Sequence, residues 1–259
     1  MKSIQSPIAI TRAVSESMND CELTHVVRTP IDVEHAREQH RAYESCLASL
    51  GCELRRIPAD DRYPDAVFIE DTSIVLDELA ILTHPGAESR WGEIDAVSEV
   101  LREYRTIARI DGPATLDGGD VLQLDRVLYV GRTLRTTSYG IERLRDLVEP
   151  HGYRVVAVTV HGCLHLKSAV TRVAADALLM NREWMPAALF KDWRIIDVDE
   201  SEPAAANALR IGESVIFPEE QVRTRRRLEA SGIDVRPVPA SELARAEGGV
   251  TCCSLIVHR

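Results

Sequence analysis

Short apolar runs alternate along the chain with segments whose apolar side chains recur at helical spacing. Apolar runs of about four to eight residues are typical of buried strands, whereas positions i, i+3, i+4 and i+7 mark one face of a helix. The first elements predicted in this way are a strand at residues 8–10, a helix at 33–50 and a strand at 52–57. Gly51 marks the end of the helix. The chain therefore opens with a strand, a helix and a second strand.

A similar module of strands, a helix and a further strand then repeats along the chain. The predicted elements are strands 66–69, 73–76 and 79–83, a helix near 97–104 and strand 106–110; strands 121–124 and 127–130, helix 141–148 and strand 153–160; strands 168–173 and 177–180, a weaker helix at 186–190 and strand 193–198; and a strand from 208, strand 215–217, helix 219–230 and strand 233–238. A last strand, 253–257, can complete a module only with the N-terminal elements. Such repeats indicate a radial or solenoidal array. We therefore predict one α/β domain, residues 1–259, in which the two chain termini meet.

One polar residue marks the beginning or end of the first strand of each module. These residues recur at intervals of 42 to 48 positions: Asp71, Asp117, His165, Asn207 and Cys252. In a closed ring they would occupy equivalent inward positions around one axis. A carboxylate, an imidazole and a thiol would then converge on one pocket, where they can serve as charge partner, general acid/base and nucleophile.

Cys252 follows the flexible pair Gly248-Gly249, which allows a sharp turn and close approach of a ligand. If residues 253–257 continue as a strand, successive side chains point to opposite faces. Cys253 then joins an apolar set suited to the core, and Cys252 joins a mixed set suited to a pocket. The alternative is that both thiols simply begin a buried strand, because free cysteine is often buried.

His165 and the acidic candidate residues also have structural explanations. A lone histidine such as His165, flanked by leucines, is more often a core residue with satisfied hydrogen bonds. Asp117 and Asp120 lie in an Asp-Gly-Gly-Asp segment that is typical of a turn. Asp65, Glu70 and Asp71 are also explained as solvated charges at the end of a strand. The combination of these residue types, more than any one of them, favours a catalytic site.

The formal net charge of −10 argues against nucleic-acid binding and is compatible with a cationic small molecule. The basic residues 223–227 lie among glutamates in a helical pattern, so we expect a solvated face. No apolar run is long enough to span a bilayer, and the first ten residues lack the apolar core of a secretion signal. Six scattered cysteines without CxxC pairs predict reduced thiols, no zinc site and a cytoplasmic location.

Six segments together resemble dimethylarginine dimethylaminohydrolase. They are DAVFIED at 65–71, PGAESR at 85–90, ATLDGGD at 114–120, LHLKS at 164–168, AAN at 205–207 and GGVTCCS at 248–254. The resemblance covers nearly the whole chain in order. It implies the pentein fold, a five-bladed pseudo-fivefold α/β propeller whose last blade is closed by the two chain termini. It also implies hydrolysis of Nω-methylated arginines to citrulline and a methylamine without a metal or other cofactor.

The resemblance further assigns roles to individual residues. Cys252 would be the nucleophile, His165 the acid/base and Asp117 the carboxylate that holds the guanidinium. The residues placed at the substrate are Asp65, Glu70 and Asp71, with Arg90 and Arg135 at its α-carboxylate, and with Leu23 and Ala246 contributing backbone contacts. Leu23 belongs to the polar connection 15–23, which is long enough to be a movable lid.

Other members of the same superfamily leave alternatives open. Arginine and agmatine deiminases and amidinotransferases use the same cysteine, histidine and carboxylate chemistry on other guanidino substrates. A binding propeller without catalytic activity is the alternative from a different class. The sequence does not give the preferred methylation state or the oligomeric state, a homodimer included.

Overall fold

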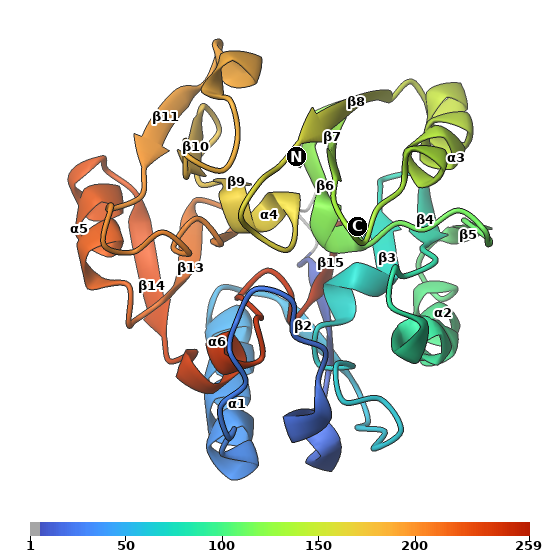
Figure 1. Ribbon diagram of the computed structural model, residues 1–259, viewed down its shortest axis with the longest axis horizontal. Helices are drawn as coiled ribbons and strands as arrows, with labels where there is room; N and C mark the ends of the chain where they lie inside the picture. The colour runs from blue at the N-terminus through green and yellow to red at the C-terminus, as the bar shows by residue number, and fades with distance from the viewer. Residues whose placement is uncertain (1–5) are drawn as a thin grey trace.

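The computed structural model describes residues 6–259 and contains five three-stranded sheets arranged around a centre (Figure 1). Residues 1–5, the start of the predicted domain and of the segment tested for a secretion signal, lie outside the described part. In every sheet the middle strand is antiparallel to the strand before it in the blade and parallel to the strand after it. This repeated pattern confirms the predicted five-bladed α/β propeller.

The blade that contains both termini consists of β15 (Leu255–Val257), β1 (Ile8–Arg12) and β2 (Glu53–Ile57). Ile8 pairs with Val257 in the antiparallel ladder and with Glu53 in the parallel one. The parallel pair requires a crossover connection, which α1 (Val33–Ser49) supplies. The two ends of the chain therefore close the ring, as the module pattern predicts.

The other four blades repeat this plan, with a helix between the second and third strands. Their elements are β3 (Ser73–Val75), β4 (Leu79–Leu82), α2 (Ile94–Leu101) and β5 (Thr106–Arg109); β6 (Val121–Leu124), β7 (Val127–Arg132), α3 (Ser138–Val148) and β8 (Arg154–Thr159); β9 (Val170–Arg172), β10 (Ala177–Met180), the short 3₁₀ helix η6 (Ala187–Phe190) and β11 (Arg194–Asp197); and β12 (Leu209–Ile211), β13 (Ser214–Pro218), α5 (Val222–Ala230) and β14 (Asp234–Val238). Contacts between β15 and β3, between β6 and β9 and between β9 and β12 place the first strands of neighbouring blades side by side. The segments that precede these strands therefore converge on the centre.

Apolar packing explains why the middle strands form where the sequence predicts them. All four residues of β4 and all four of β10 are buried. Strands covered on both faces have continuous apolar sequences, which is the pattern these segments show. Apolar clusters join adjacent blades; for example, Ile81 and Leu128 share one such core. No helix in residues 6–259 is long and apolar enough to cross a membrane.

Three predictions about local structure are wrong. Residues 66–69 are not a strand but a buried turn that leads into the 3₁₀ helix η2 (Ile69–Thr72). Cys252 and Cys253 lie in a turn, and β15 begins only at Leu255. The connection 15–23 is not simply a polar loop, because it contains a 3₁₀ helix and buries Met18 and Cys21 completely. Short apolar runs do not distinguish a buried turn from a strand.

Candidate active site

The five marker residues all lie just ahead of the first strand of a blade. Asp71 lies in η2, Asp117 precedes the 3₁₀ helix η4 (Gly118–Asp120), His165 precedes α4 (Leu166–Ala169), Asn207 lies two residues before β12, and Cys252 lies in the turn before β15. Helix η4 contacts both η2 and α4, so three of the segments meet directly. The structure therefore brings a histidine and two carboxylates from three blades together.

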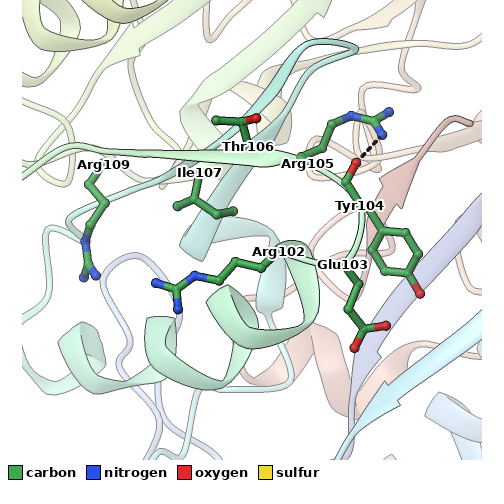
Figure 2. Close-up of a pocket in the computed structure, with 7 residues that line it drawn as sticks. All are labelled: Arg102, Glu103, Tyr104, Arg105, Thr106, Ile107 and Arg109. Atoms are coloured by element: carbon green, nitrogen blue, oxygen red, sulfur yellow. Dashed lines mark hydrogen bonds between the residues drawn. The ribbon is translucent and has the colours of Figure 1, made fainter.

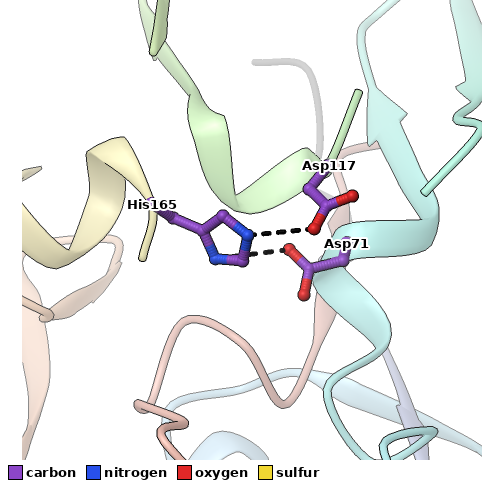
Figure 3. Close-up of side chains that lie close together, drawn as sticks. All are labelled: Asp71, Asp117 and His165. Atoms are coloured by element: carbon purple, nitrogen blue, oxygen red, sulfur yellow. Dashed lines mark hydrogen bonds and ion pairs between the residues drawn. The ribbon is translucent and has the colours of Figure 1, made fainter. Parts of the chain in front are cut away.

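The carboxylates of Asp117 and Asp71 both face the imidazole of His165 (Figure 3). Its Nε2 is 3.0 Å from Oδ2 of Asp117, and its Nδ1 is 3.8 Å from Oδ1 of Asp71. All three side chains are buried. Gly119 makes this arrangement sterically feasible, since a β-carbon there would lie 2.7 Å from Nδ1 of His165. Glycine at position 119 therefore allows close packing at the site, in addition to the turn formed by Gly118-Gly119.

The charges around His165 stabilise its protonated form. Burial alone would lower its pKa, but Asp71, the hydrogen bond to Asp117 and the charge of Asp120 outweigh burial and raise the pKa to about 9. The same pairing lowers the pKa of Asp71 against the opposing effect of burial. At neutral pH His165 is therefore an imidazolium that can donate a proton.

Asp120 fixes the backbone next to His165. Its Oδ1 accepts a hydrogen bond from the Leu166 amide at 2.9 Å, and its Oδ2 accepts bonds from Thr133 and Thr136 at 2.7 and 2.6 Å. Burial is the largest cause that raises the pKa of Asp120 to about 6, and these hydrogen bonds oppose it. Asp120 thus anchors the first residue of α4 and, with it, the position of His165.

Cys252 and His165 line the same two cavities. The turn is held from both sides, because the Cys252 amide donates to the Gly249 carbonyl and its own carbonyl accepts from the Glu70 amide. Burial, followed by the charges of Glu70 and Asp71, raises the pKa of Cys252 to about 12. In the unliganded protein this side chain is therefore a thiol, and a bound cation is needed to favour the thiolate.

A buried polar network supports the turn that carries Cys252. Thr251 donates to Oε2 of Glu70 at 2.7 Å and accepts from Nδ2 of Asn207 at 2.9 Å, while the Thr251 amide donates to Oδ1 of Asn207. Lys167 pairs with the other oxygen of Glu70 at 2.5 Å. Glu70, expected at the substrate, thus also holds the turn that carries Cys252, and Asn207 forms two hydrogen bonds to Thr251 from the neighbouring blade.

A second buried network lies behind Asp71. Arg90 donates to Oδ2 of Asp71 at 2.6 Å, to both oxygens of Glu93 and to the Phe68 carbonyl. Burial would lower the pKa of Arg90, but Glu93 and Asp71 raise it well above the usual value. The guanidinium is therefore permanently charged, and several of its N–H donors are already used within the protein.

Two compartments meet at Cys252 and His165. The narrow compartment has a volume of about 20 Å³, and most of the residues expected at the substrate line it: Asp65, Asp71, Arg90, Arg135 and Ala246. The wide cavity has a volume of about 310 Å³ and extends from the same two residues past Trp184, Asn207 and Gln221. Glu70 and Leu23 line neither compartment.

The segment after Cys21 lies over the narrow compartment. The Glu22 amide donates to both carboxylate oxygens of Asp65, and the amides of Thr24 and His25 donate to the carboxylate of Glu247 at 2.6 and 2.9 Å. The neighbouring Leu23 packs against the apolar cluster of the terminal blade. The backbone of this lid segment is therefore tied to both walls of the site.

The reasoning from sequence did not identify Asp120, Lys167, Thr251 or Glu247 as parts of the site. Each lies within three residues of one that was identified. For the first three, this proximity in sequence was the available signal. Glu247 has a further distinguishing feature, since its backbone φ of 59° is unusual for a residue with a β-carbon. Such conformations persist where surrounding contacts hold them, and here the lid amides do so.

A larger hollow elsewhere on the protein shows no comparable chemistry. It has a volume of about 730 Å³ and lies at the outer end of α2 and along β5 (Figure 2). Arg105, drawn there, uses its guanidinium on the carbonyls of Leu76, Tyr104 and His258. The hollow is a shallow surface between structural contacts.

The donor atoms of Asp71, Asp117 and His165 lie within 4.8 Å of one another, which is also the spacing of a metal site. In the metal-free protein the same two carboxylates, together with Asp120, raise the pKa of His165 against burial to about 9 and neutralise an imidazolium.

Comparison with known proteins agrees with this geometry. The family described as arginine deiminase matches residues 194–259. The dimethylarginine dimethylaminohydrolase of Streptomyces coelicolor is 37% identical over 95% of this chain and 95% of its own length. A structure of dimethylarginine dimethylaminohydrolase from Pseudomonas aeruginosa, a cysteine-to-serine mutant complexed with citrulline, has a TM-score of 0.91 at 33% identity and covers 96% of this chain and 98% of its own.

A further dimethylarginine dimethylaminohydrolase structure, with a histidine-to-glycine change and an adduct of S-methyl-L-thiocitrulline, gives the same TM-score of 0.91 at 33% identity, covering 96% of this chain and 98% of its own.

Proposed function

The chain belongs to the dimethylarginine dimethylaminohydrolase family, and we propose that it hydrolyses dimethylarginine and monomethylarginine to citrulline and dimethylamine or methylamine, with residues 1–259 as one catalytic domain. The observation that carries the proposal is that Cys252 and His165 line the same two compartments, with two carboxylates facing the His165 imidazole. A thiol next to a buried imidazolium provides the nucleophile and the acid that cleavage of a C–N bond requires.

The charges that line the narrow compartment match the amino-acid end of the substrate, and its volume of about 20 Å³ means that the lid segment or lining side chains move when this end binds. Arg135 lines it and is partly exposed, so its guanidinium can form a planar pair with the α-carboxylate. Arg90 contributes positive charge at the wall of this compartment, and Asp65 offers a carboxylate to the α-amino group. Leu23 and Ala246 would add backbone contacts from the lid segment and from the turn before the nucleophile.

The substrate cation activates its own nucleophile. A guanidinium is planar and always charged, and its central carbon is a poor electrophile until it is held in position. Asp71 lines the narrow compartment, where it can hold the guanidinium. Asp117 lines neither compartment, so its negative charge acts from behind His165, to which it is bonded. Glu70 adds negative charge next to the Cys252 turn. Binding this cation beside Cys252 offsets the negative charges that raise the pKa of the thiol, so the thiolate forms in the complex.

The reaction then proceeds in two steps. The Cys252 thiolate adds to the guanidinium carbon, the bond to the methylated nitrogen breaks, and His165 donates a proton to that nitrogen as the amine leaves. Water then adds to the thiouronium carbon and gives a proton to His165, the C–S bond breaks, and citrulline and the thiol are released. One water is consumed for each citrulline and amine formed, and no electron acceptor or metal takes part.

Product analysis tests the proposal. The purified protein, incubated with dimethylarginine and with arginine, is expected to release citrulline and dimethylamine from the first faster than citrulline and ammonia from the second. Arginine deiminase activity is the second candidate, because that family matches the C-terminal quarter of the chain. Ammonia from arginine as the faster reaction would favour the deiminase. Absence of citrulline from both substrates would overturn hydrolysis altogether.

We also propose that the enzyme works in a reducing compartment, the cytoplasm. All six cysteines are unpaired, and proteins of oxidising compartments rarely keep so many free thiols.

A further inference from the structure

The wide cavity differs in character from the narrow compartment with which it shares Cys252 and His165. Four acidic residues and two arginines line the narrow compartment in a small volume: Glu22, Asp65, Asp71 and Glu247, with Arg90 and Arg135. The wide cavity is lined largely by uncharged side chains, including Val26, Trp184, Pro203 and Pro218. The charged, narrow compartment suits the amino-acid end of the substrate. The wide cavity, which starts from the same two residues, then receives the substituted guanidinium nitrogen.

That other end carries the nitrogen that is expelled. His165 must reach this nitrogen to protonate it, and His165 lines the wide cavity as well. The two acidic side chains that line the cavity, Glu220 and Glu247, give its wall a negative charge. An expelled amine gains a second proton in water and becomes a cation, which such a wall attracts.

The volume of the wide cavity exceeds what the methylated substrates require. About 310 Å³ is at the lower end of the range of small-molecule sites, roughly 300–1,000 Å³. A dimethylamino group, with one nitrogen and two carbons, occupies only the part next to Cys252. Ala204 and Ala244 both line the cavity with small, exposed side chains, which leave room for a longer chain.

We propose that the wide cavity is a subsite for Nω-substituents larger than methyl, and that the enzyme releases primary alkylamines and arylalkylamines from the corresponding Nω-substituted arginines. This inference rests on the proposed function. The covalent step is unchanged: the bond from the guanidinium carbon to the substituted nitrogen breaks, His165 protonates that nitrogen, and water restores the thiol and leaves citrulline.

The test compares kcat/KM for Nω-butyl-L-arginine and Nω-benzyl-L-arginine with that for Nω-methyl-L-arginine, measured as citrulline formed. The expected values for the bulky substrates lie within about tenfold of the value for the methyl substrate. Values more than tenfold lower, with the methyl substrate turned over normally, would overturn the subsite and leave the proposed function intact. No citrulline from any of the three would overturn the proposed function and the subsite with it.

Variants that fill the cavity provide the second arm. Ala244→Phe and Ala204→Phe are each expected to lower the ratio of butyl to methyl kcat/KM at least tenfold. Ala48→Phe places the same side chain at an exposed position of α1 outside the cavity and serves as the matched control with an unchanged ratio. An unchanged ratio in both cavity variants, each shown to be folded by circular dichroism, would place the substituent elsewhere and overturn the inference.

Discussion

Nε2 of His165 lies 3.0 Å from Oδ2 of Asp117, and neither side chain has more than slight contact with solvent. The two residues come from different blades, and each lies immediately ahead of a short helix. The pair joins a proton donor to a fixed negative charge in an environment that excludes water. The charge state of His165 therefore depends on the carboxylates of its neighbours.

Replacement Asp117→Asn tests this dependence. Removal of one negative charge and of a charge-assisted acceptor is expected to lower the pKa of His165 from about 9, by roughly 1–3 units for a neighbouring charge of this kind. Because His165 must be protonated to release the amine, the alkaline limb of the kcat profile should move to lower pH. A profile with the wild-type alkaline limb would contradict the pairing.

The same pKa predicts how stability depends on pH. The pKa of His165 is raised in the folded protein from 6.5 to about 9, so its contribution is fully present below pH 6.5 and is lost as pH rises through 9. At about 1.4 kcal/mol per pKa unit, the loss amounts to a few kcal/mol. Urea unfolding from pH 6 to 10 should show this decline in the wild type and a smaller decline in His165→Gln. Parallel curves for the two proteins would rule out the shift.

Arg90 and Arg135 should respond differently to lysine. Arg135→Lys is expected to raise KM for methylarginine with little change in stability, since this partly exposed side chain makes only a 3.4 Å contact with Thr24. Arg90→Lys should raise KM and also lower the free energy of unfolding by roughly 1–3 kcal/mol, because a lysine keeps the charge but cannot make all the hydrogen bonds of Arg90 to Asp71, Glu93 and the Phe68 carbonyl. Equal effects of the two changes on unfolding would contradict the buried network.

Cys253 offers a control for the neighbouring thiol. It is fully buried in the apolar cluster of the terminal blade, where its sulfur lies 3.5 Å from the Gly249 carbonyl. Cys253→Ser should retain turnover and lose roughly 1–3 kcal/mol of stability, the usual cost of placing a hydroxyl in a core. Loss of turnover in a folded Cys253→Ser protein would contradict this placement.

Much of the fold follows from sequence because the middle strands β1, β4 and β10 are short, largely apolar runs buried on both faces. Residues 177–180 were predicted with the bounds that β10 has, and the pairing of both termini followed from the incomplete last module. The prediction that Cys252 faces the pocket rested on strand alternation, yet a turn orients the two thiols. The pattern could not reveal this turn, since its hydrogen bonds to Glu70 and Asn207 come from distant segments.

The site was predictable as a set of residues but not as a network. Equal spacing brought out Asp71, Asp117 and His165, because a pseudo-symmetric ring places equivalent positions at its centre. Asp120 was interpreted as a turn residue, and the three hydrogen bonds that make it an anchor come from Thr133, Thr136 and Leu166. Hydrogen bonds that a buried carboxylate receives from residues distant in sequence leave no periodic pattern in the sequence.

The most direct test of the account is covalent capture on Cys252. His165→Gly protein is incubated with S-methyl-L-thiocitrulline, whose methanethiol leaving group does not need a proton from His165, and is then analysed by intact mass spectrometry and peptide mapping. The account predicts one adduct per chain, located on Cys252. It predicts no adduct in the double variant that carries both His165→Gly and Cys252→Ser. An adduct on Cys253 or Cys163, or no adduct with a folded protein, would contradict the assignment of Cys252 as the nucleophile.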